Sequence, residues 1–130
     1  MNREILMKRL QSLGINGIFM HNIMAMYGKT EYCVKLKDGH TRAIKSNLGL
    51  KQGCPLSPML FNLYIDDIKD IFDDKCDPIN IQNTKINHFL YADDLVILSE
   101  SKAGLQRGID KAYNFAKAKR LTISVKKAKL

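Results

Sequence analysis

The sequence predicts an α+β protein with a mostly antiparallel sheet, and three patterns lead to this fold class. Helical and strand-like segments follow one another without a regular strand–helix repeat. Strand-like stretches meet at turn-forming residues, once near Asp38-Gly39 and once near Ala92-Asp93. Apolar residues recur at helical spacing before residue 28 and again after residue 57. At 130 residues the chain fits one domain with a modest core.

Two helices and a hairpin are expected in the first part of the chain. The first helix has four apolar residues at helical spacing and Gly14 as a suitable stop: Ile5, Leu6, Leu10 and Leu13. The second helix is expected over 16–27, with Gly28 ending it and these side chains inward: Ile18, Phe19, Ile23 and Met26. Met20, Met24 and Met26 are interpreted as core filler. Residues 30–36 alternate as a strand, Asp38-Gly39 supplies the turn, and residues 41–45 return.

A long helix, a second hairpin and a further helix are expected after residue 56. Ser57 is a good N-cap, and Pro58 suits the first helical position. An apolar stripe then runs down the helix to the polar cluster 73–78: Leu60, Phe61, Tyr64, Ile65, Ile68, Ile71 and Phe72. Ser101 begins another helix that ends near Lys119 and has one apolar face: Leu105, Ile109, Ala112 and Ala116. Residues 121–125 alternate as a last strand.

Composition excludes several classes of protein. With 45% hydrophobic and 26% charged residues, the chain has the composition of a folded domain. We expect no membrane association, because no apolar stretch approaches the roughly 18 residues that a membrane span needs. Cys33, Cys54 and Cys76 are odd in number and lack metal-ligand spacing. They favour a reduced intracellular location, cytoplasmic or nuclear.

The net charge of +8 is unevenly distributed. Residues 111–130 contain seven Lys or Arg and no acid, whereas residues 66–77 contain six Asp and two Lys. A basic terminal region is typical of a nucleic-acid partner, which it would bind through phosphate neutralisation. The alternative is a solvated helix face that happens to be basic, and charge alone does not decide between them.

Two adjacent acids, Asp93 and Asp94, lie between apolar runs of strand length. The flanking residues 88–92 and 95–98 predict a hairpin with the acids at its tip, fixed rigidly by apolar burial on both sides. Paired carboxylates on a rigid tip can bind a divalent cation without a large ordering cost. A turn that merely uses Asp for solubility is the alternative. A tight primed turn favours Gly or Asn where φ is positive, and Ala92 there indicates strain tolerated for function.

Residues 49–58, Gly-Leu-Lys-Gln-Gly-Cys-Pro-Leu-Ser-Pro, predict a rigid loop that leads into a helix N-terminus. Gly53 permits close approach of a planar ligand, and Gln52 offers both a donor and an acceptor. Unsatisfied N–H groups at the helix start suit phosphate. An ordinary stiff connector is the alternative.

Residues 49–61 together with residues 89–95, Phe-Leu-Tyr-Ala-Asp-Asp-Leu, resemble a reverse transcriptase of the non-LTR retrotransposon and group II intron type. The resemblance covers almost the whole chain and implies one partial domain over 1–130, a polymerase palm with part of the fingers. It implies RNA-templated DNA synthesis with Mg²⁺, or with Mn²⁺, and RNA template, DNA primer and dNTP as partners.

The resemblance also implies roles for individual residues. Asp93 would be the main metal ligand and Asp94 its partner in two-ion phosphoryl transfer. Gln52 and Gly53, with Tyr91, would contact the incoming nucleotide and its template base. Lys127, in a later palm motif, would lie near the triphosphate as a proton donor; the alternative is a solvated residue of the basic tail. That motif departs from the family at two positions, because Arg120 replaces a usual Gly and Ala128 a usual Thr or Ser.

One element of the family pattern is missing. A further metal-binding Asp belongs on a strand just before the first helix, and the sequence begins at Met1, a residue or two beyond it. The upstream fingers and the thumb are missing too. We therefore expect a truncated, incomplete palm with an open sheet edge, which needs the rest of the polymerase and is inactive alone. The alternative is a non-catalytic remnant that binds nucleic acid or a protein partner through Lys126, Lys127 and Lys129. An RNA-templated RNA polymerase is less favoured, since viral relatives usually carry Gly where Ala92 stands.

Overall fold

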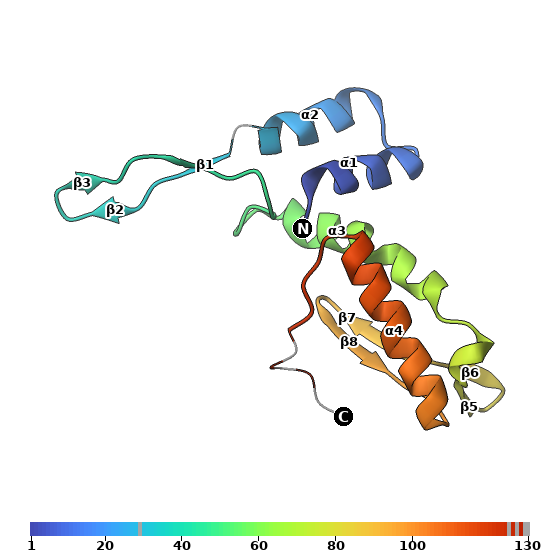
Figure 1. Ribbon diagram of the computed structural model, residues 1–130. Coiled ribbons are helices and arrows are strands. Elements are labelled where there is room, and N and C mark those ends of the chain that lie inside the picture. Colours follow the sequence, from blue (N-terminus) through green and yellow to red (C-terminus); the bar gives the residue numbers. More distant parts are fainter. Residues whose placement is uncertain (29, 125, 127, 129–130) are drawn as a thin grey trace. The chain divides into compact units, whose positions relative to one another are not determined.

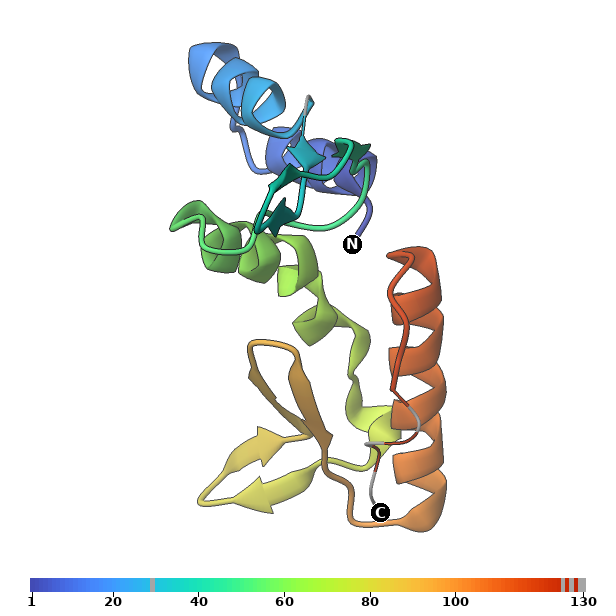
Figure 2. The same cartoon turned by 90° about the vertical axis from the view of Figure 1, so that its left-hand side faces the viewer.

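The computed structural model describes residues 1–28, 30–124, 126 and 128, and the chain divides into two compact units. Unit 1 covers Met1–Tyr64 and unit 2 covers Ile65–Leu130. Each unit combines helices with antiparallel strands, which confirms the α+β class (Figures 1 and 2). Among the described residues, none of the helices has the length and apolar character that crossing a bilayer requires.

Helix α1 (Arg3–Ser12) opens unit 1 as the sequence predicts. Asn2 caps it, because its side-chain oxygen accepts a hydrogen bond from the Ile5 N–H at 3.2 Å. Leu6 and Leu10 are fully buried. The chain leaves the helix through Gly14, whose φ of +82° suits a residue without a Cβ atom.

Helix α2 (Gly17–Gly28) forms as predicted but buries a different face. Met20, Ile23 and Tyr27 point inward, at a spacing of three and four residues. Three of the predicted inward residues are exposed: Ile18, Phe19 and Met26. Two of the three methionines interpreted as core filler, Met24 and Met26, are therefore at the surface. The prediction failed because this helix is apolar nearly all round, so periodicity does not select one side.

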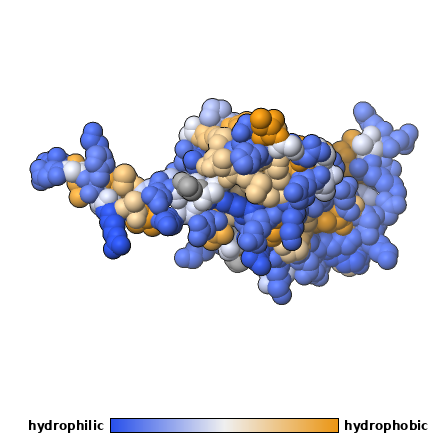
Figure 3. All heavy atoms as spheres, turned by 90° about the horizontal axis from the view of Figure 1, so that it is seen from above, coloured by the Kyte–Doolittle hydropathy of each residue, from blue (hydrophilic) through white to orange (hydrophobic). Residues whose placement is uncertain are grey.

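Strands β1 to β4 form one exposed ribbon that projects from the helices of unit 1 (Figure 1). β1 (Glu31–Tyr32) pairs with β4 (Ile44–Lys45), and β2 (Lys35–Leu36) pairs with β3 (Gly39–His40). Three residues separate β3 from β4 whereas two separate β1 from β2, so the returning strand contains a one-residue bulge. Hydrophobic side chains remain at the surface of the ribbon (Figure 3).

Helix α3 (Leu56–Ile65) is followed by two 3₁₀ segments, η1 (Asp66–Ile71) and η2 (Asp74–Cys76). The predicted apolar stripe is mostly confirmed, with five members buried: Leu60, Tyr64, Ile65, Ile68 and Phe72. The predicted cap is wrong, because the helix begins at Leu56 and Ser57 already lies inside its first turn. The Ser57 hydroxyl instead donates to the Lys51 carbonyl at 2.7 Å.

Unit 2 contains two hairpins and helix α4 (Lys102–Ala118). The hairpins are β5 (Ile79–Ile81) with β6 (Thr84–Ile86), and β7 (His88–Tyr91) with β8 (Asp94–Ile97). α4 packs against η1, η2 and β8. The core there is a cluster of buried residues, Ile68, Phe72, Cys76 and Ala112, and four partly buried residues cover it: Ile71, Leu95, Ile97 and Phe115.

The strands pair antiparallel as predicted, but they do not form one sheet. Within the described ranges each strand pairs with one partner, which gives four two-stranded sheets. The predicted last strand is also wrong where it can be checked, because residues 121–124 lie in no strand and Val125 falls outside the described residues. The chain departs from α4 through Arg120, whose φ is +52°.

Candidate functional site

The β7–β8 hairpin places the two adjacent acids at its tip, as the sequence predicts. Tyr91 pairs with Asp94, so the turn between the strands consists of Ala92 and Asp93. Ala92 has φ of +51°, and Asp93 is not among the residues with positive φ. Positive φ at the first turn position alone is the pattern of a type II′ turn, which normally has Gly there. The expected strain at Ala92 is therefore present.

The hairpin is held from one side only. Residues two apart in a strand share a face. One face meets the unit 2 core through Leu95 and Ile97, and through the His88 ring, which stacks on Phe72 with ring centroids 4.7 Å apart. On the opposite face Phe89 and Val96 remain 56% and 51% exposed. The expectation of apolar burial on both sides is thus wrong for the outer face, since no further strand or helix of unit 2 covers it in the part that the structure describes.

Asp93 and Asp94 are both exposed, and Asp94 shares the outer face with Tyr91. Neither carboxylate takes part in an ion pair with the described residues. Likewise, no group of three or more His, Cys, Asp or Glu side chains suited to a metal occurs among them. Two unpaired carboxylates are consequently available at the tip, and the described part of unit 2 places no third His, Cys, Asp or Glu with them in a metal-binding group.

The loop that contains Gln52 and Gly53 lies in unit 1 and leads into α3. Both residues are exposed. Gly53 has φ of +79°, and a Cβ atom built on it would meet nothing within 4 Å. Backbone conformation therefore requires glycine here, and the space above it is open. Two backbone bonds shape the loop: Cys54 N–H to the Lys51 carbonyl at 3.3 Å, and Ser57 N–H to the Cys54 carbonyl at 3.0 Å.

Cys54 sits at the start of α3 among hydrogen-bond donors. The Leu56 N–H is the largest influence on the Cys54 thiol and lowers its pKa below the ordinary value, outweighing burial, which raises it; the Ser57 N–H acts in the same direction as Leu56. The donors at this helix start thus favour a negative charge, as the sequence indicates for the loop.

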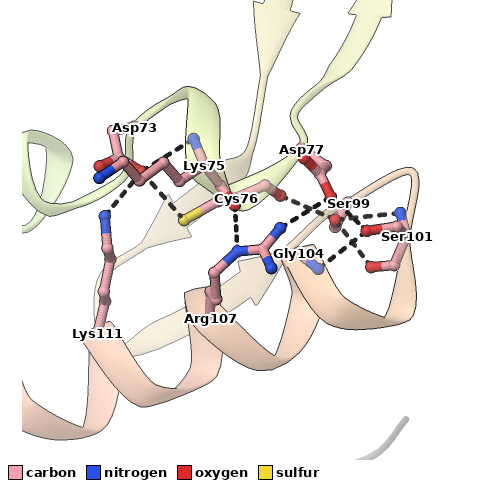
Figure 4. Close-up of polar contacts among 9 residues, drawn as sticks. All are labelled: Asp73, Lys75, Cys76, Asp77, Ser99, Ser101, Gly104, Arg107 and Lys111. Atoms are coloured by element: carbon pink, nitrogen blue, oxygen red, sulfur yellow. Dashed lines mark hydrogen bonds and ion pairs between the residues drawn. The ribbon is translucent and has the colours of Figure 1, made fainter.

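Part of the charge asymmetry seen in the sequence is neutralised by ion pairs within unit 2, two of which are drawn in Figure 4. Lys111 lies 2.7 Å from Asp73 and lowers the pKa of that carboxyl. Arg107 and Asp77 are 3.0 Å apart. A third contact of 2.7 Å joins Lys119 to Asp67. The basic face of α4 therefore pairs with the acidic segment 66–77, which reduces the basic surface left for a nucleic acid.

Two other predictions concern the basic end of the chain. Lys127, the predicted proton donor, lies outside the described residues, as does Lys129. Lys126 is described and exposed.

Sequence reasoning missed the polar network around η2 and the N-terminus of α4. Ser101 caps α4 by accepting from the Gly104 N–H at 2.9 Å, and it also bonds Asp77. Ser99 donates to the Cys76 carbonyl at 2.8 Å. The Ser-x-Ser pattern at 99–101 marks a helix start, but its partners are 23 and 24 residues away and have no signal in the sequence.

Comparison with known proteins identifies the family. The family model described as "Reverse transcriptase (RNA-dependent DNA polymerase)" matches residues 1–130. The chain is 40% identical over 67 residues to the Pol polyprotein of type-2 retrotransposable element R2DM from Drosophila melanogaster, covering 52% of this chain and 6% of that protein.

Two other retrotransposable-element relatives, both named as type-1 element R2 Pol polyproteins, match more of the chain. The Nasonia vitripennis protein is 32% identical over 89 residues, 68% of this chain and 9% of its own length. The Popillia japonica protein is 28% identical over 132 residues, 93% of this chain and 17% of its own length. The chain thus spans a small part of each relative, and it belongs to the reverse transcriptase family of non-LTR retrotransposon type.

Proposed function

We propose that residues 1–130 are the palm, with part of the fingers, of a retroelement enzyme that copies RNA into DNA. One observation carries this proposal: the tip of β7–β8 presents two adjacent carboxylates that are exposed and form no ion pair with the described residues. Structural acids elsewhere in unit 2, such as Asp73 and Asp77, are paired with α4. Acids kept free at a strained turn fit a role in binding a cation.

Asp93 and Asp94 fit a divalent ion of the Mg²⁺ or Mn²⁺ type. Mg²⁺ is usually held by one or two carboxylates, several waters and substrate phosphates, and this tip supplies that number of carboxylates. When bound, such ions would activate the primer 3′-hydroxyl and stabilise the leaving pyrophosphate. A two-ion site needs at least one more carboxylate on the opposite side of the ions. We therefore propose that the isolated chain does not polymerise and that another segment completes the site.

The nucleotide side of the proposal involves Gln52, Gly53 and Tyr91. Gln52 can donate to and accept from a base edge, and Gly53 leaves open space for a planar group. Tyr91 is 84% exposed and directly precedes the tip, so its ring is free to contact a nucleotide.

Metal binding by the tip is testable in the chain itself. Titration with Mn²⁺ should broaden backbone NMR signals of residues 92–95 more than those of the β2–β3 turn, which has the single acid Asp38. Asp93→Asn or Asp94→Asn should remove the effect, and Asp38→Asn should leave it unchanged. Equal broadening at both turns would contradict a specific site.

Polymerisation is tested in a chimera in which the part of this chain that aligns with the Popillia japonica relative replaces the matching segment of that protein. We expect dNTP incorporation on an RNA template that Asp93→Asn abolishes and Asp38→Asn preserves. The 130-residue chain alone should show no incorporation with Mg²⁺ or Mn²⁺. Synthesis that survives Asp93→Asn would contradict the proposal.

A second candidate function is nucleic-acid binding without catalysis, and the ribbon 31–45 favours it. All of its residues are exposed, and Lys35, His40 and Lys45 share one face. This candidate predicts salt-dependent RNA binding that Asp93→Asn leaves intact. Neutralising Lys126, Lys127 and Lys129 should weaken the binding, and so should neutralising Lys35 and Lys45 of the ribbon. Binding that is independent of salt would exclude it.

A further inference from the structure

Arg3 joins three separate segments of unit 1 through one guanidinium group. Its Nη1 donates to the Tyr27 carbonyl and to the Ser46 carbonyl, both at 2.6 Å. Its Nε donates to the Gly49 carbonyl at 3.1 Å, and Nη2 lies 3.4 Å from the Leu48 carbonyl. The guanidinium also lies over the Tyr27 ring, 5.3 Å from its centroid. Arg3 thus holds the end of α2 and the segment 46–49 that enters the Gln52–Gly53 loop.

Tyr27 holds the exit of the same loop. Its hydroxyl lies 3.1 Å from the Ser57 Oγ, and Ser57 Oγ donates to the Lys51 carbonyl at 2.7 Å. Because the single Ser57 hydroxyl proton is used on Lys51, the Tyr27 hydroxyl must be the donor to Ser57. Tyr27 is 2% exposed, so this pair of hydrogen bonds begins at a side chain that is held in the core.

Together these contacts fix both ends of a loop whose centre is exposed. Entry at 46–49 is held through three carbonyl groups, and exit is held at Lys51 and Ser57. A cation in the first turn of a helix opposes the helix dipole, so α1 itself gains nothing from Arg3 at this position. Its contacts with distant carbonyls explain why an arginine is placed there.

We propose that Arg3 and Tyr27 are positioning residues that hold the Gln52–Gly53 loop in the shape that receives the incoming nucleotide. The role in nucleotide binding rests on the proposed function, whereas the contacts that hold the loop lie within unit 1. The two claims can therefore be tested separately.

The loop is tested first in the 130-residue chain without nucleotide. Tyr27→Phe keeps the buried ring and removes the donor to Ser57. It should raise amide exchange at 51–54 and tryptic cleavage after Lys51 about fivefold, the factor expected for one neutral hydrogen bond. Exchange in α1 and α4 should not change. Tyr32→Phe, on the exposed ribbon, is the matched control.

Cys54 supplies a local readout that general destabilisation would not move in the same way. Because the Leu56 N–H, at the exit of the loop, lowers the pKa of Cys54, loosening of the loop in Tyr27→Phe should shift the pH profile of Cys54 alkylation upward. Arg3→Lys keeps the charge but loses the planar fork, so it should loosen the loop as well, whereas Arg42→Lys on the ribbon should not. Unchanged exchange, cleavage and alkylation in both variants would overturn the proposal.

The link to the nucleotide is tested in the chimera with the Popillia japonica relative. We expect Tyr27→Phe to raise KM for dNTP severalfold with little change in kcat. A loosened loop with unchanged KM would overturn the positioning role. A chimera that is folded but inactive with wild-type residues would overturn the proposed function, while the exchange and alkylation results would still decide whether the loop is held.

Discussion

Gly104 and Gly108 lie on the buried face of α4, and alanine at the two positions should have different effects. A Cβ atom at Gly104 would lie 2.4 Å from Ser99 Oγ, 2.7 Å from the Cys76 carbonyl oxygen and 2.8 Å from Asp77 Cβ. Overpacking of this kind costs about 1–3 kcal/mol. Displacing Ser99 would also remove its bond to Cys76, worth about 1 kcal/mol.

Helix propensity opposes these losses, since alanine is about 0.8–1.0 kcal/mol better than glycine inside a helix. The net expectation for Gly104→Ala is a loss of about 1–3 kcal/mol. At Gly108 the Cβ would meet one atom closely, Ile97 Cγ2 at 2.9 Å, on a half-buried side chain that can adjust. Gly108→Ala should therefore stay within about 1 kcal/mol of the wild type.

Urea unfolding followed by circular dichroism, with amide exchange of α4, measures both variants. In a thermal unfolding experiment on a unit of this size, a loss of 1 kcal/mol in the free energy of unfolding would lower Tm by roughly 4–8 °C. If Gly104→Ala were as stable as Gly108→Ala, the close packing of α4 on η2 would be refuted, because propensity alone would then explain both results.

Three further predictions concern ionisable groups of unit 2. Burial lowers the pKa of His88, so the neutral ring contributes to stability above about pH 6.5, and the contribution is lost as the pH falls through the lower pKa of the folded state. In His88→Phe, Tm should therefore change less with pH over this range. The pKa of Asp73 is lowered by Lys111, so ionised Asp73 contributes to the free energy of unfolding fully above about pH 4, and the contribution is lost as the pH falls further. Lys111→Gln should make the free energy of urea unfolding depend less on pH in this acid range. At neutral pH, Lys111→Gln should lower stability only slightly by the same measurement, because both side chains are partly exposed and solvent screens the pair.

Local signals predicted most of the elements. Gly14 and Gly28 lie at the helix ends expected for them, Ser101 caps α4, and Asp93 lies in the predicted turn. Each of these depends on residues within one or two helical turns of each other. Capping and turn signals of this kind can be recognised in the local sequence without knowledge of the rest of the fold.

Predictions that depend on distant partners were less successful. The predicted apolar face of α4 is half right: Ala112 and Ala116 are buried, but Gly104 and Gly108 take the inner positions expected for Leu105 and Ile109. Cys76 and Ser99 approach Gly104, and Ile97 approaches Gly108, too closely for larger side chains. A prediction from the spacing of apolar residues gives most weight to large side chains, so it does not identify glycines on a buried helix face. The partners of Lys111 and Lys119 were missed for a similar reason, since their acids lie 38 and 52 residues earlier in the chain.

The turn at Ala92 permits a last prediction, about whether its strain serves the acids. An L-residue at positive φ costs about 1–2 kcal/mol, whereas Ala→Gly loses about 0.4–1 kcal/mol through the unfolded state. Ala92→Gly should therefore be neutral or stabilise β7–β8 by up to about 1.5 kcal/mol, measured by amide exchange at the hydrogen-bonded Phe89–Val96 pair. Gln82→Gly in the β5–β6 turn, where Gln82 has φ of +48°, is the matched control.

Mn²⁺ titration then separates stability from function in this turn. If Ala92 holds Asp93 and Asp94 for a cation, Ala92→Gly should weaken Mn²⁺ broadening at the tip even as the hairpin becomes more stable, because glycine widens the range of turn conformations. Gln82→Gly should leave that broadening unchanged. Weaker exchange protection in Ala92→Gly would show that Ala92 carries no strain, and the case for function at the tip would then depend on the free carboxylates alone.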